Sequence, residues 1–292
     1  MRTQTCSTIV QTLSFFRNEL DYTSVSLTEI NQQKNVIAII PARYNSVRLE
    51  GKLLRLLGDK PLILHTLEQA KKAKNVSRVI IATDDERIFR VVSESGHEVV
   101  MTADSHQSGS DRIAEVAENL PENSIVVNVQ GDEPLISPRT IEKAVDALLK
   151  DESVLMSTTC ERIEDYRDVL STDVVKVVID ENGFALYFSR SPIPFPRDSV
   201  KKYGTLENAF REDSGLISTF RKHTGIYVYR REFLLKFNKL PQSKLEKIEM
   251  LEQLRALENG VKIKVVEVLE SSIGVDTLED FERVEKILSK NL

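Results

Sequence analysis

The sequence predicts an α/β fold built around a mostly parallel central sheet, with a smaller lobe that contains a β-hairpin. From residue 36 onward, short apolar runs typical of strands alternate with longer runs whose apolar residues recur at helical spacing. The run 124–129 is apolar almost throughout, as in a strand covered on both faces of its sheet. Residues 174–188 interrupt the alternation, because Asn182-Gly183 joins two strand-like runs and is typical of a hairpin turn.

The elements can be predicted in order along the chain. We expect strands at residues 36–40, 79–82, 124–129, 154–158, 225–229 and 262–268. We expect helices at residues 62–74, 83–92, 138–149, 163–170, 232–237, 245–258 and 277–288. The prolines within 191–196 predict an extended loop, and the polar, irregular stretch 197–220 predicts a flexible surface segment. Residues 174–237 would then form the smaller lobe.

Composition argues against several classes of protein. The 292 residues carry a net charge of −5 without a Lys/Arg-rich tract, which argues against a nucleic-acid binder. No apolar run is long enough to span a bilayer, so no membrane partner is expected. The two cysteines, Cys6 and Cys160, lack metal-ligand spacing, so we expect a reduced, cytoplasmic setting.

The first 35 residues differ from the rest of the chain. Thr, Ser and Gln dominate them, and their apolar cluster at 13–16 is too short and too interrupted for a signal peptide. We therefore expect residues 1–35 to be a flexible N-terminal extension without catalytic residues. Residues 36–292 would form the folded domain.

A cluster of cations follows the first predicted strand. Arg43, Arg48 and Lys52 lie within the loop-like stretch 41–52, and the end of a strand is where α/β proteins hold phosphates. Three such side chains suit a triphosphate, and Gly51 would let the backbone approach it closely. The alternative interpretation is a solvated basic turn.

Two carboxylates follow other predicted strands. Asp132 comes after strand 124–129, and Asp276 comes after strand 262–268. Together they could share Mg²⁺, which prefers oxygen ligands and substrate phosphates. Alternatively, Asp132 is a turn residue in Gly-Asp-Glu-Pro, and Asp276 belongs to a helix start. Cations for phosphates together with carboxylates for a metal favour phosphoryl or nucleotidyl transfer.

The common nucleotide-binding motifs are absent from the sequence. It contains no G-x-x-x-x-G-K-[ST] motif, which argues against a P-loop kinase. It also contains no G-x-G-x-x-G motif after the first strand, which argues against a dehydrogenase. A Rossmann-like sheet with a different phosphate loop therefore remains.

Seven motifs, in order along the chain, carry a resemblance to a known family. They are 40–43 with Ser46, Arg48, Leu49, Gly51 and Lys52; 106–112; 127–134; 185–190 with Ile193 and Pro194; His223 with 225–227; 246–255; and 274–277. On these motifs, residues 36–292 resemble the 3-deoxy-manno-octulosonate (Kdo) cytidylyltransferases. The resemblance implies a Rossmann-like nucleotidyltransferase and a homodimer, with 174–237 over the sugar site and in the dimer contact.

The resemblance also implies a reaction and its residues. The anomeric hydroxyl of Kdo would attack the α-phosphorus of CTP, giving pyrophosphate and CMP-Kdo for lipopolysaccharide biosynthesis. The implied catalytic residues are Arg43, Arg48, Lys52, Asp132 and Asp276, of which Asp132 and Asp276 would hold Mg²⁺. The implied nucleotide-binding residues are Ala42, Arg43, Ser46, Lys52, Ser108, Gly109, Arg112, Gln130 and Asp132. The implied sugar-binding residues are Gln130, Arg190, His223, Tyr227, Glu246 and Glu249.

Two alternatives to this function remain open. The same chemistry on 8-amino-Kdo or sialic acid is one, although sialic acid enzymes usually lack the runs 130–134 and 187–190. A catalytically weakened nucleotide-binding protein is the other. It is suggested by Glu50 and Leu53, which replace both prolines of the family's Leu-Pro-Gly-Lys-Pro-Leu. Glu50 would either weaken CTP binding by repulsion or face solvent, and we expect a modestly raised KM for CTP.

Overall fold

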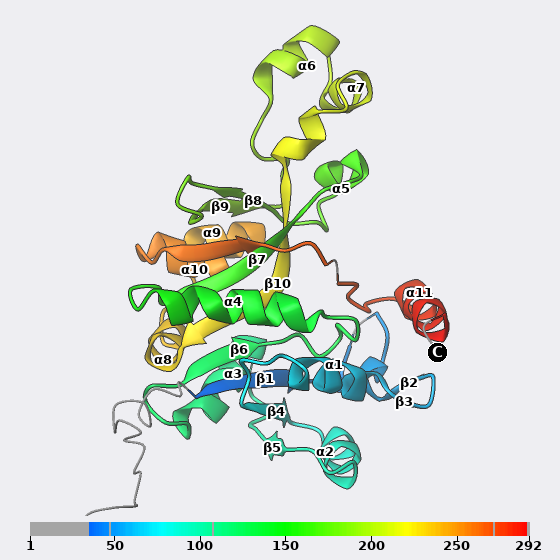
Figure 1. The fold of residues 1–292 in the computed structure, drawn as a ribbon, viewed down its shortest axis with the longest axis vertical. Helices are drawn as coiled ribbons and strands as arrows, with labels where there is room; N and C mark the ends of the chain where they lie inside the picture. The colour runs from blue at the N-terminus through cyan, green and yellow to red at the C-terminus, as the bar shows by residue number, and fades with distance from the viewer. Residues whose placement is uncertain (1–34, 47, 107, 271, 291–292) are drawn as a thin grey trace, which may run out of the picture. The chain divides into compact units, whose positions relative to one another are not determined.

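The computed structural model describes residues 35–46, 48–106, 108–270 and 272–290 (Figure 1). Apart from Asn35, the predicted N-terminal extension therefore lies outside the described residues. Within them, the main sheet contains nine strands. These are β1 (Val36–Ala42), β4 (Arg78–Thr83), β5 (Val99–Met101), β6 (Ile125–Asn128), β7 (Met156–Arg162), β8 (Lys176–Ile179), β9 (Ala185–Ser189), β10 (Arg221–Arg230) and β11 (Ile263–Glu267). A separate small hairpin pairs β2 (Leu56–Leu57) with β3 (Lys60–Pro61).

Helices connect most of these strands. They are α1 (Leu62–Lys71), α2 (Glu86–Glu94), α3 (Gly109–Glu118), α4 (Pro138–Lys150), α5 (Tyr166–Leu170), α6 (Arg197–Tyr203), α7 (Leu206–Glu212), α8 (Arg231–Asn238), α9 (Lys244–Glu249), α10 (Gln253–Glu258) and α11 (Leu278–Ser289). Two single 3₁₀ turns, η1 (Lys52–Leu54) and η2 (Leu216–Thr219), complete the set of described helices. No helix among the described residues is long and apolar enough to cross a membrane.

The main sheet is mostly parallel, as predicted. Its strands run in the order β11-β7-β10-β6-β1-β4-β5, and β1 pairs in parallel with both β4 and β6. The exception in this row is β10, which lies antiparallel between β6 and β7. After β7 the chain forms the smaller lobe, which includes β8 and β9, and returns through β10, so β10 runs in the opposite direction to β6 and β7 (Figure 1).

Burial on both faces explains why β1 is apolar throughout. Val36, Ala38 and Ile40 belong to a core that includes residues of α1, α4 and α11. Ile37 and Ile39 belong to a second core with α3, α8 and α10. Helices therefore cover both sides of the strand, and polar side chains are left for its carboxyl end.

The predicted hairpin is present and forms part of the smaller lobe. Strands β8 and β9 pair in antiparallel fashion, and β8 is also paired to β10 through Lys176 and Lys222. In Figure 1 the hairpin lies at the end of the sheet toward α5, and α6 and α7 lie beyond it.

The prediction that residues 197–220 are irregular was wrong. This segment contains α6, α7 and η2, and Thr205 caps the start of α7. Phe210 and Phe220 pack with Ile163 and Val169 in a small core of their own. The apolar residues of this core come from separate parts of the chain, so no local periodicity in 197–220 indicated the helices.

Other boundaries also differ from the prediction. Residues 245–258 form two helices, α9 and α10, because Met250 adopts a left-handed conformation (φ 54°) that ends α9. Strand β10 begins at Arg221, four residues before the predicted start at 225. Helix α3 and the short strands β2, β3 and β5 were not predicted.

Candidate active site

A cavity of about 280 Å³ lies where β1 and β6 end, at the shared carboxyl edge of these parallel strands. It contains seven of the residues predicted for nucleotide binding or catalysis. The lining residues are Pro41, Arg43, Asn45, Ser46, Lys52, Leu53, Ser108, Gly109, Gln130, Gly131 and Asp132. Ala42, in contrast, is fully buried in the core beneath the loop and does not line the cavity.

Gly131 allows β6 to reach this edge closely beside β1. A Cβ atom on Gly131 would lie 3.0 Å from the Pro41 carbonyl oxygen and 3.2 Å from Ile63 Cδ1. The Thr66 hydroxyl also donates to the Gly131 carbonyl at 3.0 Å. A side chain at 131 would push the two strand ends apart, so glycine there keeps Asp132 beside the loop that follows β1.

Lys52 joins the two predicted metal ligands. Its Nζ lies 2.6 Å from Asp132 Oδ2 and 2.9 Å from Asp276 Oδ1, and it also donates to the Val275 carbonyl at 2.9 Å. Burial works against the charged ammonium, but the two carboxylates outweigh it and raise the pKa of Lys52. Lys52 is therefore cationic at neutral pH.

Asp276 reaches the site through a backbone contact. The Val275 amide donates to the Asp132 carbonyl at 2.9 Å, which brings the segment before α11 beside the end of β6. Thr277 caps α11 in a capping box with Asp280, so the predicted helix start is present as well. The Asp276 carboxylate remains half-exposed and accepts from Arg48 Nη2 at 3.0 Å.

The carboxylates of Asp132 and Asp276 fit the predicted Mg²⁺. Both lie within 3 Å of the same ammonium, so their oxygens converge on a point that already holds one positive charge. No group of three or more His, Cys, Asp or Glu side chains among the described residues could hold a metal alone. Two carboxylates completed by substrate phosphates are the donor set that Mg²⁺ uses in nucleotide enzymes.

Tyr44 shapes the turn of the cationic loop. Gly51 has φ +64°, and its amide donates to the Tyr44 carbonyl at 3.2 Å. A Cβ atom on Gly51 would lie 3.0 Å from Tyr44 Oη. Arg87, from α2, lies over the Tyr44 ring at 3.2 Å from its centroid. The hydrogen bond to Asp85 is the main cause that raises the pKa of Arg87, and the charge of the exposed Glu50 is a smaller cause.

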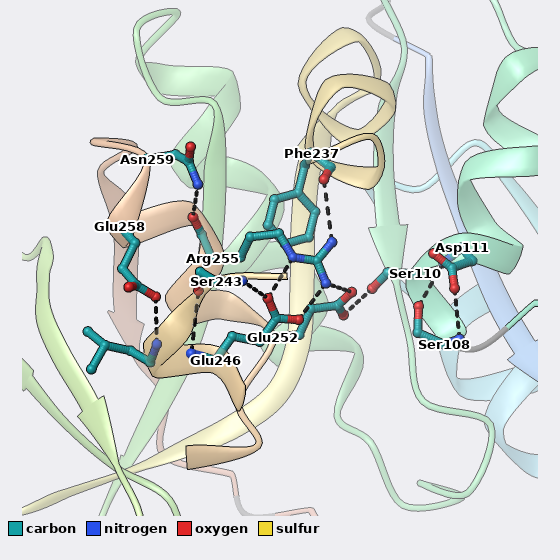
Figure 2. A network of polar contacts seen from close by, with 11 residues as sticks. Ser108, Ser110, Asp111, Phe237, Ser243, Glu246, Glu252, Arg255, Glu258 and Asn259 are labelled. Atoms are coloured by element: carbon teal, nitrogen blue, oxygen red, sulfur yellow. Dashed lines mark hydrogen bonds and ion pairs between the residues drawn. The ribbon is translucent and has the colours of Figure 1, made fainter. Parts of the chain in front are cut away.

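Arg43 and the start of α3 form the opposite side of the cavity. Arg43 Nη2 donates to the His106 carbonyl at 2.8 Å. Ser108 caps α3, and Asp111 returns the contact to the Ser108 amide, so this helix begins with a capping box (Figure 2). The start of α3, at Ser108 and Gly109, therefore lines a cavity that is also lined by Arg43 and Lys52, which favours an anionic ligand.

Arg112 does not line the cavity, contrary to the predicted contact with the nucleotide. Its side chain is fully buried, and its guanidinium donates to Asp84 and to the Thr102 hydroxyl. Since Asp84 follows β4 directly, Arg112 fastens α3 to the end of that strand. The residue type fitted a ligand contact, but its position on the inner face of α3 gives it a structural role.

Gln130 follows β6, and His223 and Tyr227 lie on β10. Gln130 Nε2 donates to the carbonyl of Gly225 at 3.3 Å, and Gly225 lies between His223 and Tyr227 in the sequence. His223 Nε2 is 2.8 Å from the Thr158 hydroxyl, and its ring packs against Tyr227 at 5.3 Å between centroids. Burial lowers the pKa of His223 to about 3, so this histidine is a neutral hydrogen-bonding group. Burial likewise raises the pKa of Tyr227 well above its ordinary value.

Arg190 and Glu249 contact each other through two hydrogen bonds, and Ser189 adds a third to Glu249. The Arg190 amide donates to Glu249 Oε2 at 3.0 Å, and Arg190 Nε donates to the Glu249 carbonyl at 2.8 Å. The Ser189 hydroxyl donates to Glu249 Oε1 at 2.7 Å. Glu249 thus orients the turn after β9, and Arg190 Nη1 reaches the Thr172 carbonyl at 3.0 Å.

Glu246 does not share an exposed face with Glu249, and its predicted role as a sugar ligand is not supported by its position. Its side chain is 7% exposed and is paired with Arg255, whose side chain is also 7% exposed. It also accepts from the Ser243 amide as part of the capping box of α9. The carboxylate is therefore committed to holding α9 and α10 together.

Two residues near the site were missed by sequence reasoning. Asn45 lines the cavity within the loop whose cations were recognised, so its place in that loop was the available signal. Glu133 follows Asp132, and burial together with the charge of Asp132 raises the pKa of Glu133 to about 7. Burial of Glu133 depends on β10 and the C-terminal segment, which no local pattern indicates.

Known proteins are similar to this sequence over most of its length. A family profile of cytidylyltransferases matches residues 37–263. The chain is 50% identical over 251 residues to the 3-deoxy-manno-octulosonate cytidylyltransferase of Trichlorobacter lovleyi, which covers 86% of this chain and 97% of that protein. It is 49% identical over 250 residues to the enzyme of the same name from Geobacter sulfurreducens, covering 86% and 98%.

A solved structure agrees with these sequence relatives. The structure of a CMP:2-keto-3-deoxy-manno-octonic acid synthetase complexed with CTP superimposes with a TM-score of 0.79 at 38% identity. The match covers 89% of this chain and 100% of that one. On this agreement of sequence and fold, the chain belongs to the 3-deoxy-manno-octulosonate cytidylyltransferases and is a nucleotidyltransferase.

Proposed function

We propose that this enzyme transfers CMP from CTP to the anomeric hydroxyl of Kdo, which yields CMP-Kdo and pyrophosphate. The observation that carries the proposal is the convergence of Lys52, Asp132 and Asp276 beside the cavity. These three groups come from distant parts of the chain, and all of them are suited to a magnesium–triphosphate. The relatives named for this reaction support the choice of CTP and Kdo.

Charge neutralisation and alignment are the main requirements of this reaction. The sugar oxygen forms a bond to the α-phosphorus, the bond from that phosphorus to the bridging oxygen breaks, and pyrophosphate leaves with the electron pair. The hydroxyl proton is released. Arg43, Arg48 and Lys52 would bind the phosphate oxygens and stabilise the negative charge of the departing pyrophosphate.

Asp132 and Asp276 would hold Mg²⁺, which supplies a Lewis acid for the phosphate oxygens and lowers the pKa of the attacking hydroxyl. Lys52 contacts both carboxylates. Its ammonium keeps two negative groups close together before the substrates arrive, and its flexible stem lets it move to a phosphate oxygen afterwards.

The acceptor site would be formed by β6, β10 and the turn after β9. Gln130 lines the nucleotide cavity and also contacts β10, so it is placed to meet either substrate. Neutral His223 and Tyr227 would bind sugar hydroxyls, and the Arg190 guanidinium would pair with the sugar carboxylate. The second candidate acceptors are 8-amino-Kdo and sialic acid, which are also acid sugars.

The cellular setting is part of the same proposal. CMP-Kdo would be used in lipopolysaccharide biosynthesis, and the enzyme would act in the cytoplasm as a homodimer. The lobe 174–237 would contribute to the dimer contact, because a hairpin that leaves the main sheet presents an edge to a second copy. Analytical ultracentrifugation of the purified protein tests the dimer directly.

Pyrophosphate release tests the reaction. Purified protein is given CTP and Mg²⁺ with Kdo, 8-amino-Kdo or sialic acid, and UTP replaces CTP as a control. We expect turnover with Kdo that prefers CTP and that stops when EDTA removes the metal. Folded protein that binds CTP but turns over none of the three acids would instead be the weakened nucleotide-binding homologue.

A further inference from the structure

Figure 2 shows a chain of polar contacts that the reaction itself does not explain. It begins at the first turn of α3, beside the nucleotide cavity, and it ends in the α9–α10 segment. Its central members are Ser110, Glu252, Arg255 and Glu246. None of these four side chains lines the nucleotide cavity.

The nucleotide end of this chain of contacts is a buried hydrogen bond. Ser108 and Gly109 line the cavity, and Ser110 follows them on the first turn of α3. Ser110 is buried, and its hydroxyl donates to Glu252 Oε2 at 2.5 Å. Any shift of α3 on binding a nucleotide would therefore displace the Glu252 carboxylate.

In the middle of this chain of contacts, Arg255 pairs with the carboxylates of Glu252 and Glu246. Arg255 lies near Glu252 Oε1, at 3.4 Å from its Nη2, and binds Glu246 through two nitrogens. Its guanidinium also lies 4.8 Å from the Phe237 ring. Because Arg255 and Glu246 are almost fully buried, solvent screens their pairing little. The position of Glu252 is thus transmitted to the capping box of α9.

The other end of this chain of contacts reaches the turn that contains Arg190. Glu246 lies in the first turn of α9, and Glu249 is the last residue of this short helix. Glu249 in turn accepts from the Arg190 amide and from Ser189. A displacement of α9 would therefore move the guanidinium assigned above to the sugar carboxylate.

We propose that Glu252 is a positioning residue that couples the nucleotide-facing start of α3 to the placement of Arg190. The inference rests on the proposed function, because it concerns how the CTP and Kdo sites act together. A carboxylate suits this role, since one oxygen accepts from the Ser110 hydroxyl and the other faces a guanidinium. Binding of the nucleotide would thereby prepare the acceptor site.

The test measures coupling between the two substrates. Isothermal titration gives the affinity for Kdo with and without a non-hydrolysable CTP analogue, in the presence of Mg²⁺, and the ratio is the coupling factor. For the wild-type protein we expect a factor of about five- to tenfold, within the usual range for coupled sites. Ser110→Ala and Glu252→Ala should bring it close to one, and Glu252→Gln should retain part of it.

A matched control lies at the other end of α10 from Glu252. Glu258 accepts from the Leu245 amide at 3.0 Å and is not one of the four central members of this chain of contacts (Figure 2). Glu258→Gln should keep the wild-type coupling factor, which separates coupling from general disturbance of α10. The double variant Ser110→Ala/Glu252→Ala should lose no more coupling than either single variant, because both remove the same link.

The outcomes separate this inference from the proposed function. Variants that keep the wild-type thermal stability but lose coupling support the positioning role, and Ser110→Ala is the mildest of them. An active wild-type enzyme whose Ser110→Ala and Glu252→Ala variants retain coupling overturns the inference alone. A wild-type protein that turns over no acid sugar overturns the proposed function, and the inference with it.

Discussion

The ammonium of Lys52 lies 2.6 Å from Asp132 Oδ2 and 2.9 Å from Asp276 Oδ1. Lys52 comes from the loop after β1, Asp132 from the end of β6 and Asp276 from the segment before α11. Three chain segments are thus held together by one positive charge. The positive charge of Lys52 offsets the repulsion between the two carboxylates and lets them lie close together.

Replacing Lys52 should affect catalysis strongly. Lys52→Met should lower kcat/KM by about 10²- to 10³-fold, the usual effect of losing one charge-stabilising group from a polar active site. Lys52→Arg should lose less, because it retains the charge. Steady-state pyrophosphate release measures both variants. Lys60→Met, which removes a more exposed pairing with Glu68, should leave turnover near the wild-type value.

Adding a side chain at Gly51 should disturb the phosphate loop. Gly51→Ala must adopt φ +64° and must also displace Tyr44. Gly58→Ala carries only the cost of its left-handed backbone, because nothing lies within 4 Å of its Cβ position. We expect about 1–2 kcal/mol of lost stability for Gly58→Ala and more for Gly51→Ala. Only Gly51→Ala should raise the KM for CTP. Equal effects of the two variants on stability and KM would argue against a role for Tyr44.

Breaking the buried pair of Glu246 and Arg255 should destabilise the protein. Glu246→Gln should cost about 3–5 kcal/mol at pH 7, because it leaves the Arg255 charge buried without its main partner. Urea unfolding of the variant and the wild type gives the difference. Glu207→Gln, which weakens an exposed pair with Arg211, should change stability by less than about 1 kcal/mol.

The destabilisation by Glu246→Gln should depend on pH in a definite direction. Burial opposes ionisation of Glu246, but Arg255 and the Ser243 amide outweigh it and lower the pKa of this carboxyl below its ordinary value of 4.5. The ionised pair therefore contributes stability above that ordinary value, and the contribution is lost as pH falls through the lowered pKa. The difference between wild type and variant should shrink below pH 4.5. A constant difference across this range would contradict the ionised pair.

Glu50 should have little influence on CTP binding. Its side chain is exposed, and the carboxylates that raise the pKa of Lys52 are those of Asp132 and Asp276. The structure therefore does not favour the modestly raised KM that the sequence predicts. Glu50→Gln should change the KM for CTP by less than about twofold, because water screens exposed charges. A larger decrease in KM would show that the carboxylate does repel the triphosphate. The same assay decides between these results.

The sequence was most informative where a pattern is local. Apolar runs located β1, β4 and β6, because a strand covered on both faces must be apolar along its whole length. The residues that follow those strands, including Arg43, Lys52 and Asp132, could be recognised because polar groups at strand ends are exposed to ligands. The Asn182-Gly183 turn likewise located the hairpin of β8 and β9.

Tertiary structure alone decided the rest. Arg112 and Glu246 have residue types that suit ligands, yet helix packing buries both and gives them structural partners. The antiparallel direction of β10 and the approach of Asp276 to Lys52 depend on where distant segments return. The physical reason is that periodicity and charge along a chain describe each segment separately, whereas burial and pairing arise only when segments meet.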